Sequence, residues 1–166
     1  LDNAASRNIT SYNTLGFYCD QDMLEIGVST SDGKLTDVEN QTHYDLWAQM
    51  QSPLLAGNNL PDMSDAVLNI YLNTEVNAIN QDSSGWSGRR VKQANGIDLW
   101  YKRCFTRNPT TKAQITDQTQ MKKSVIVFNR NASQSTYSIL RTDPLEFGAG
   151  TAYQVRDLWK HANICT

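Results

Sequence analysis

The sequence of 166 residues predicts an α/β region, residues 1–82, followed by an all-β region, residues 83–166. Two observations predict this division. Before residue 82, a strand-like apolar segment, a helix-like segment and a second strand-like segment follow one another, the order of a βαβ unit. After Ser83 the apolar residues instead recur at every second position, which is the period of a β-strand.

The first strand and helix have clear local signals. A short apolar segment, Met23–Ile26, ends at Gly27 and predicts the first strand. Thr36, followed three residues later by Glu39, forms the pattern of a capping box and predicts a helix start. The helix then presents one stripe at i, i+3, i+4 and i+7: His43, Leu46, Trp47 and Met50.

Pro53 predicts the end of this helix, and Leu54–Ala56 reads as a short strand buried on both faces. Ser64 is a candidate cap for a second helix, and Asn73 is a candidate stop. The predicted apolar stripe of the second helix is Val67, Leu68, Tyr71 and Leu72. Further helical turns are expected up to Asp82.

The all-β region begins near residues 83–88. Ile97, Leu99 and Tyr101 alternate with Asp98, Trp100 and Lys102, which predicts a strand with one apolar face. Further strands are predicted at Ser124–Asn129, Thr136–Leu140 and Thr151–Trp159. The polar segment Thr106–Gln120, with Pro109 and several threonines, predicts a long exposed hairpin loop.

Composition excludes several classes of function. The formal net charge of -2 and the pI of about 5.6 give no overall field that would attract nucleic acid. Apolar runs such as Val125–Phe128 are far shorter than the roughly 20 residues of a membrane span. No spacing of cysteine or histidine predicts a metal site, and no phosphate-binding or dinucleotide motif predicts a cofactor.

Cysteines and sequons bear on the cellular compartment. Three sequons, at Asn8, Asn40 and Asn131, would carry surface glycans in a secreted protein, and we expect secretion. The three cysteines, Cys19, Cys104 and Cys165, are an odd number, so one would be free, buried or bridged to a segment outside this sequence.

Four segments carry a resemblance to a known family. They read CDQDMLEIG from Cys19, SPLLAGNNL from Ser52, VNAINQD from Val76 and VRDLWKH from Val155. In this order they resemble glycoside hydrolase family 27, the α-galactosidases and α-N-acetylgalactosaminidases.

The resemblance implies a fold. Residues 1–82 would be the last two βα units of a (β/α)8 TIM barrel, and residues 83–166 an incomplete antiparallel β-sandwich. A complete barrel needs about 250 residues. We therefore expect the remaining barrel strands to come from another chain or from a segment missing from this sequence.

The resemblance also implies a site for an α-galactoside. Asp22 and Met23 match residues that line the family's galactose pocket, where a carboxylate accepts hydrogen bonds from sugar hydroxyls and a methionine packs on the ring. Without the family resemblance, the sequence would predict that Asp22 is a turn residue and that Met23 is part of the core. Asp20 is expected to be structural. Gln21 stands where the family usually has proline, which puts the pocket geometry in question.

The catalytic aspartates of the family lie upstream of the matched segments, so no acid in this chain is assigned a catalytic role. The sequence thus predicts the C-terminal part of a retaining α-galactosidase-like glycosidase. The alternative is a catalytically inactive relative that serves as a structural or glycan-binding element of an extracellular assembly.

Overall fold

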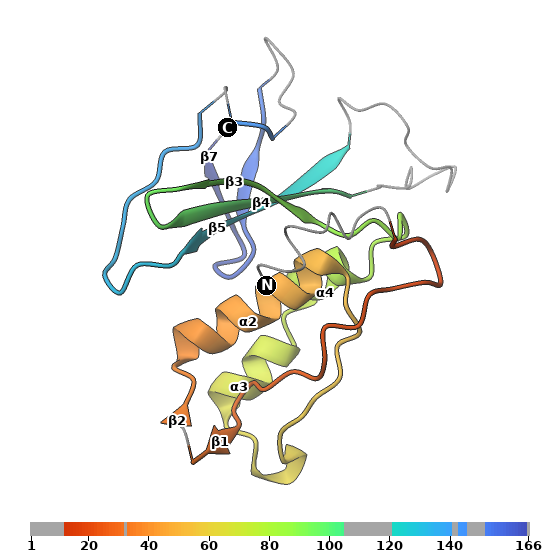
Figure 1. Cartoon of the computed structure of the whole chain (residues 1–166), viewed down its shortest axis with the longest axis vertical. Helices are drawn as coiled ribbons and strands as arrows, with labels where there is room; N and C mark the ends of the chain where they lie inside the picture. The colour runs from red at the N-terminus through yellow and green to blue at the C-terminus, as the bar shows by residue number, and fades with distance from the viewer. Residues whose placement is uncertain (1–11, 32, 105–120, 141–142, 146–151, 166) are drawn as a thin grey trace.

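The computed structural model describes residues 12–31, 33–104, 121–140, 143–145 and 152–165. The helices lie in one half of the molecule together with the short β1–β2 sheet, and the other two sheets lie in the other half (Figure 1). The helical half contains β1 (Ser29–Thr30), β2 (Gly33–Lys34), α2 (Asp37–Met50), η2 (Leu60–Asp62), α3 (Asp65–Tyr71) and α4 (Thr74–Asn80). The other half contains β3 (Arg89–Ala94), β4 (Ile97–Cys104), β5 (Lys122–Asn129), β6 (Val155–Asp157) and β7 (Ala162–Cys165).

Helix α2 begins at the predicted capping box. Thr36 Oγ1 accepts a hydrogen bond from the Glu39 backbone N–H at 3.3 Å, and the Thr36 N–H donates to Glu39 Oε2 at 2.8 Å. The helix ends at Met50 because Gln51 adopts the left-handed region with φ of 58°. It therefore ends before Pro53, the residue predicted to stop it.

The two predicted strands of the α/β region meet in parallel but form only a single bridge. Leu24 pairs with Ala56, the Leu24 N–H donates to Leu55 O at 2.7 Å, and the Gly57 N–H donates to Leu24 O at 2.9 Å. Helix α2 lies between these segments in the chain. The parallel sense agrees with the prediction, but within the described residues neither segment forms a strand beyond this bridge. Leu55 and Ala56, predicted as buried on both faces, are exposed.

Helix α2 is buried on two faces, not on the single stripe that periodicity predicted. Tyr44 and Ala48 pack into a core cluster with Leu24, Ile26, Val67, Ile70 and Val76. Leu46 and Met50 pack on another side against Trp100 of β4. His43 and Trp47, predicted as core, are only partly buried. The helix is thus a layer between α3 and α4 and the β-sheet.

The second predicted helix is α3, and the further helical turns expected up to Asp82 are α4. Ser64 caps α3 as predicted and accepts from the Val67 N–H at 3.4 Å. Asn73 is both the predicted stop and the N-cap of α4, since its Oδ1 accepts from the N–H groups of Glu75 and Val76. The predicted stripe is partly wrong: Val67 and Ile70 are buried, while Leu68 and Leu72 are 40% and 61% exposed.

Strand β4 is the centre of an antiparallel sheet with the order β3-β4-β5. The predicted strands over 97–101 and 124–129 are confirmed, and β3 was not predicted individually. Both faces of β4 are buried, because the face with Trp100 and Lys102 turns toward α2 and α4. Lys102 Nζ donates to Ile79 O at 2.6 Å and to Gln51 Oε1 at 3.2 Å.

The C-terminal predictions succeed only in part. No strand forms over residues 136–140, and the strand predicted over 151–159 is limited to β6, which pairs with β7 in a hairpin. The segment 106–120, predicted as an exposed loop, lies outside the described residues.

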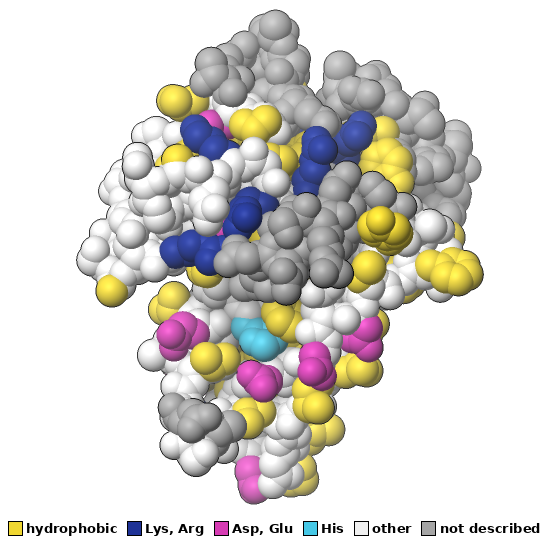
Figure 2. All heavy atoms as spheres, in the orientation of Figure 1, with side chains coloured by type: hydrophobic (Ala, Val, Ile, Leu, Met, Phe, Trp, Pro, Cys, Tyr) yellow, Lys and Arg dark blue, Asp and Glu magenta, His cyan; other side chains and the backbone are white. Residues whose placement is uncertain are grey.

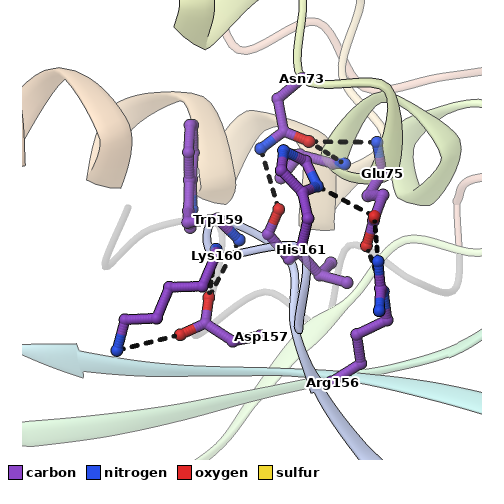
Figure 3. Close-up of polar contacts among 9 residues, drawn as sticks. Asn73, Glu75, Arg156, Asp157, Trp159, Lys160 and His161 are labelled. Carbon is purple, nitrogen blue, oxygen red and sulfur yellow. Dashed lines mark hydrogen bonds and ion pairs between the residues drawn. The ribbon is translucent and has the colours of Figure 1, made fainter. Parts of the chain in front are cut away.

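Polar contacts attach the β6–β7 hairpin to the helices, and we call the residues that make them the polar joint: Asp45, Asn73, Glu75, Arg156, Trp159 and His161. Figure 3 labels all of these residues except Asp45. Arg156 Nε and Nη2 donate to the two oxygens of Glu75 at 2.7 and 2.6 Å. His161 Nδ1 lies 2.9 Å from Glu75 Oε1. Trp159 Nε1 is 3.1 Å from both oxygens of Asp45. Asn73 Nδ2 donates to Leu158 O at 3.1 Å.

Two carboxyl groups of the polar joint have opposite pKa shifts. Burial raises the pKa of Asp45 to about 6, despite the hydrogen bond from Trp159. The hydrogen bonds from Arg156 and then His161 lower the pKa of Glu75 to about 2. Because each group differs from its ordinary pKa, the stability of the folded chain depends on pH through both.

We predict that Leu46→Ala lowers the free energy of unfolding by about 2–5 kcal/mol, because it leaves a cavity in the buried contact with Trp100. Val38→Ala on the same helix removes an exposed side chain and should change this free energy by at most about 0.5 kcal/mol. Urea unfolding measures both. Equal effects of the two variants would contradict the assignment of the α2–β4 contact as core.

We predict that Asp45→Asn removes a pH-dependent loss of stability. The raised folded-state pKa means that ionisation of Asp45 opposes folding as pH rises from about 4 to about 6. The wild type should therefore lose about 1–3 kcal/mol of unfolding free energy over this window. Urea unfolding at pH 4, 5, 6 and 7 should show a flatter profile for the variant. The stabilising contribution of Glu75 is lost only as pH falls from about 4.5 toward 2, so the two windows are separate.

Candidate functional site

The candidate site is a bulge of the chain, residues 20–23, beside the segment 52–56. On one side of the bulge, Ser52 Oγ donates to Cys19 O at 3.1 Å. On the other, Leu24 forms the parallel bridge with Ala56. Both ends of the bulge are therefore fixed to the same neighbouring segment, and the residues between them project from it.

Asp22 lies in the bulge with φ of 82°, a backbone conformation that residues other than glycine rarely adopt. Three hydrogen bonds hold it there. Its N–H donates to Asp20 Oδ1 at 3.1 Å, its Oδ1 accepts from the Met23 N–H at 2.7 Å, and its carbonyl accepts from Trp47 Nε1 at 2.9 Å. Asp20 thus acts within the loop, whereas Asp22 Oδ2 has no partner among the described residues.

Met23 follows directly and is 51% exposed. Its position requires glycine at residue 57. A Cβ atom built on Gly57 would lie 2.6 Å from Met23 Sδ and 2.8 Å from Leu24 O, and both distances are too short. Gly57 therefore lets the methionine side chain lie against the backbone of the neighbouring segment.

The sequence predicts Asp22 and Met23 as sugar contacts, and the structure places both on the surface at adjacent positions. It missed Trp47, which the periodicity assigned to the core but which is the donor that holds the Asp22 carbonyl. It also treated Gly57 as scaffold. His43 and Trp47 are spaced i, i+4, which is a sequence signal for neighbouring rings on one face of α2, and their ring centroids lie 4.1 Å apart at an interplanar angle of 31°.

This arrangement offers groups that can bind a ligand, but it does not offer the two free carboxyl groups that acid–base hydrolysis needs. It offers one free carboxylate oxygen and one exposed thioether side chain. Asp20 is committed to the Asp22 N–H. A pocket of about 350 Å³ exists elsewhere, and neither Asp22 nor Met23 lines it.

The three sequons have different environments. Asn8 lies outside the described residues, and Asn131 is exposed. Asn40 is 0% exposed, its Oδ1 accepts from the Gly27 N–H at 3.2 Å and its Nδ2 donates to Leu35 O at 3.5 Å. Since a glycan would be attached to this Nδ2, the buried contact is a correction to the expectation of a surface glycan at Asn40.

Two further expectations concern the cysteines and membranes. Cys19 is partly buried and Cys104 is buried, and both are free thiols. Burial raises the pKa of Cys104 to about 11, which keeps it protonated. None of the described helices combines the length and the apolar character needed to cross a bilayer.

Comparisons with known proteins agree on one class. A family model described as "Alpha galactosidase A" matches residues 3–82. An α-galactosidase of Cyamopsis tetragonoloba is 33% identical over 147 residues, covering 89% of this chain and 31% of the relative. An α-galactosidase of Oryza sativa subsp. japonica is 31% identical over 154 residues, covering 93% and 32%.

Solved structures agree as well. The structure of α-galactosidase I from Mortierella vinacea superposes with a TM-score of 0.72 at 27% identity, covering 89% of this chain and 34% of that one. The α-galactosidase of Saccharomyces cerevisiae, solved with raffinose, matches with a TM-score of 0.55 at 32% identity over 62% of this chain and 24% of that one.

The class that these matches define is the glycoside hydrolases. Within it, the chain belongs to the α-galactosidase-like proteins of glycoside hydrolase family 27. It spans about a third of the length of the curated relatives that it matches.

We predict that Gly57→Ala displaces the Met23 side chain, because the new Cβ cannot occupy the space of Met23 Sδ and the Leu24 carbonyl oxygen. With ¹³C-methyl-labelled methionine, the Met23 resonance should move in the NMR spectrum. The resonance of Met50, which is buried in the α2–β4 contact, is the internal control and should stay in place. An unchanged Met23 signal would contradict the described packing.

Proposed function

We propose that this chain forms one wall of the galactose pocket in a secreted, retaining α-galactosidase. Asp22 Oδ2 would accept hydrogen bonds from galactose hydroxyls, and the Met23 side chain would pack on an apolar face of the sugar ring. The observation that carries the proposal is the fixed bulge, which leaves one carboxylate oxygen and one apolar side chain free at adjacent positions.

The proposal includes the architecture: residues 1–82 are the last two βα units of a TIM barrel, and residues 83–166 are part of a β-sandwich. The parallel contact of Leu24 and Ala56 with α2 between them is the pairing expected of neighbouring barrel strands. Leu15, Phe17, Met23 and Leu55, in the segments that contain or precede this contact, are all more than half exposed. Further barrel strands, from another segment or chain, would cover them.

The proposed mechanism needs two carboxyl groups about 5–5.5 Å apart, one as nucleophile and one as acid and then base. The chain supplies neither. Its part is to bind and orient the sugar, so that the glycosidic bond is presented to carboxylates held by the rest of the barrel. The protein would also be secreted and would carry glycans at Asn8 and Asn131.

The test uses the full-length protein with p-nitrophenyl α-galactoside as substrate. We predict that Asp22→Ala lowers kcat/KM about 10- to 100-fold, as expected when a hydrogen bond to a charged group, worth about 1.5–3 kcal/mol, is lost. Asp37→Asn changes an exposed carboxylate in the first turn of α2 and is the matched control, with kcat/KM unchanged. An Asp22→Ala variant as active as the control would overturn the assignment of Asp22.

The alternative remains a catalytically inactive relative with a structural or glycan-binding role. Gln21 in place of the family's proline, next to a non-glycine residue at positive φ, is the feature that favours it. The wild-type full-length protein separates the two: turnover of the substrate supports the enzyme, and binding of galactose without turnover supports the alternative.

A further inference from the structure

A pocket between the helices and the β6–β7 hairpin is the second feature with the chemistry of a binding site. Its volume is about 350 Å³, and it lies where α2 and α3 meet the β6–β7 hairpin. Its lining residues are Gln41, Ala66, Asn69, Ile70, Leu72, Asn73, Trp159 and His161. No side chain of Asp, Glu, Lys or Arg is among them.

Two side-chain amides in this pocket are available to a ligand. Gln41 and Asn69 form no side-chain hydrogen bond with any of the described residues, unlike Asn73, whose amide is used within the polar joint. Each free amide carries two N–H donors and one acceptor oxygen. A pair of hydroxyl groups on neighbouring carbons can use both the donors and the acceptor.

The remaining lining residues combine apolar side chains with two rings that hydrogen bonds hold in place. Ile70 is buried, Leu72 is exposed, and the indole of Trp159 is held by its hydrogen bonds to Asp45. His161 is held through Nδ1 by Glu75, which leaves Nε2 available as a polar group (Figure 3). An aromatic ring, a short apolar wall and a few convergent polar groups are the composition of a small-molecule site.

We propose that this pocket is an ancillary binding site for a neutral saccharide, separate from the candidate active site. The absence of acidic and basic side chains from the lining disfavours anions and cations. The free amides match sugar hydroxyls, and the apolar wall with Trp159 matches the C–H surface of a sugar ring. The ligand class is argued from the lining alone, so the proposal does not depend on catalysis by this protein.

The test uses the full-length protein labelled with ¹⁵N-tryptophan and lactose as the probe. Lactose has a β-linkage, so an α-galactosidase does not cleave it. The indole of Trp159 reports on the pocket, whereas the indole of Trp47, bonded to the Asp22 carbonyl, reports on the candidate active site. We predict a saturable shift of the Trp159 signal at millimolar lactose. Trp159→Phe assigns that signal.

The Gln41→Ala/Asn69→Ala double variant should bind lactose at least about tenfold more weakly by the Trp159 signal, since two amide partners are lost. Gln93→Ala, which changes an exposed amide on β3, is the matched control and should bind like the wild type. Hydrolysis of p-nitrophenyl α-galactoside should be unchanged in the double variant, and circular dichroism checks that it is folded.

Two results would overturn the proposal: a Trp159 signal that does not respond to lactose, or a response that the double variant retains in full. A shift of Trp47 alone would also overturn it, because lactose would then bind only at the candidate active site. Failure of Asp22→Ala to affect turnover would overturn the proposed role of Asp22 and leave the pocket result unaffected.

Discussion

The position of helix α2 is the constraint on which the other parts of the structure depend. One side packs on α3, α4 and the Leu24–Ala56 bridge, and another packs on Trp100 of β4. Buried polar groups line the second contact: Gln49 bonds Ser124 through both amide atoms, and Lys102 bonds Gln51 and the Ile79 carbonyl. Because these groups would be left unsatisfied if the sheet shifted, they fix the register of helix against sheet.

The distribution of charge along the chain also favours packing of the helical half against the β half. Residues 1–82 contain 12 Asp and Glu but two Lys and Arg, whereas residues 83–166 contain 13 Lys and Arg and five Asp and Glu. Figure 2 shows the outcome on one face, with basic side chains on the β half and acidic side chains on the helical half. The net charge of -2 conceals this division. The Arg156–Glu75 pair is a direct contact between a basic side chain of the β half and an acidic side chain of the helical half.

The sequence was informative where a local signal decides the structure. The capping box of Thr36 and Glu39 and the cap at Ser64 work through neighbouring backbone groups, so both helix starts could be predicted. The alternation in β4 likewise identified a strand. What failed depended on partners distant in the chain. Leu68 and Leu72 have helical spacing, but no neighbour within the described residues buries them, and the face of β4 with Trp100 and Lys102 is buried because α2 covers it.

Contacts between residues distant in the chain also limited what could be predicted about the candidate site. The family resemblance pointed to Asp22 and Met23, but the means of holding them, the Trp47 indole and the space at Gly57, arise from contacts across 25 and 34 residues. No local pattern encodes such contacts. Asn40 is the converse case, since its sequon is a valid local pattern that tertiary burial overrides.

Helix α2 also connects the candidate site to the rest of the fold. Trp47 holds the Asp22 carbonyl, and Asp45, two residues earlier on the same helix, accepts from Trp159 in the polar joint. A rotation or shift of α2 would therefore move the donor of the bulge and the acceptor of the joint together. The β6–β7 hairpin, although remote from Asp22 in sequence, thus helps to fix the element that orients the bulge. Through this physical link, the β region supports the geometry of the candidate site.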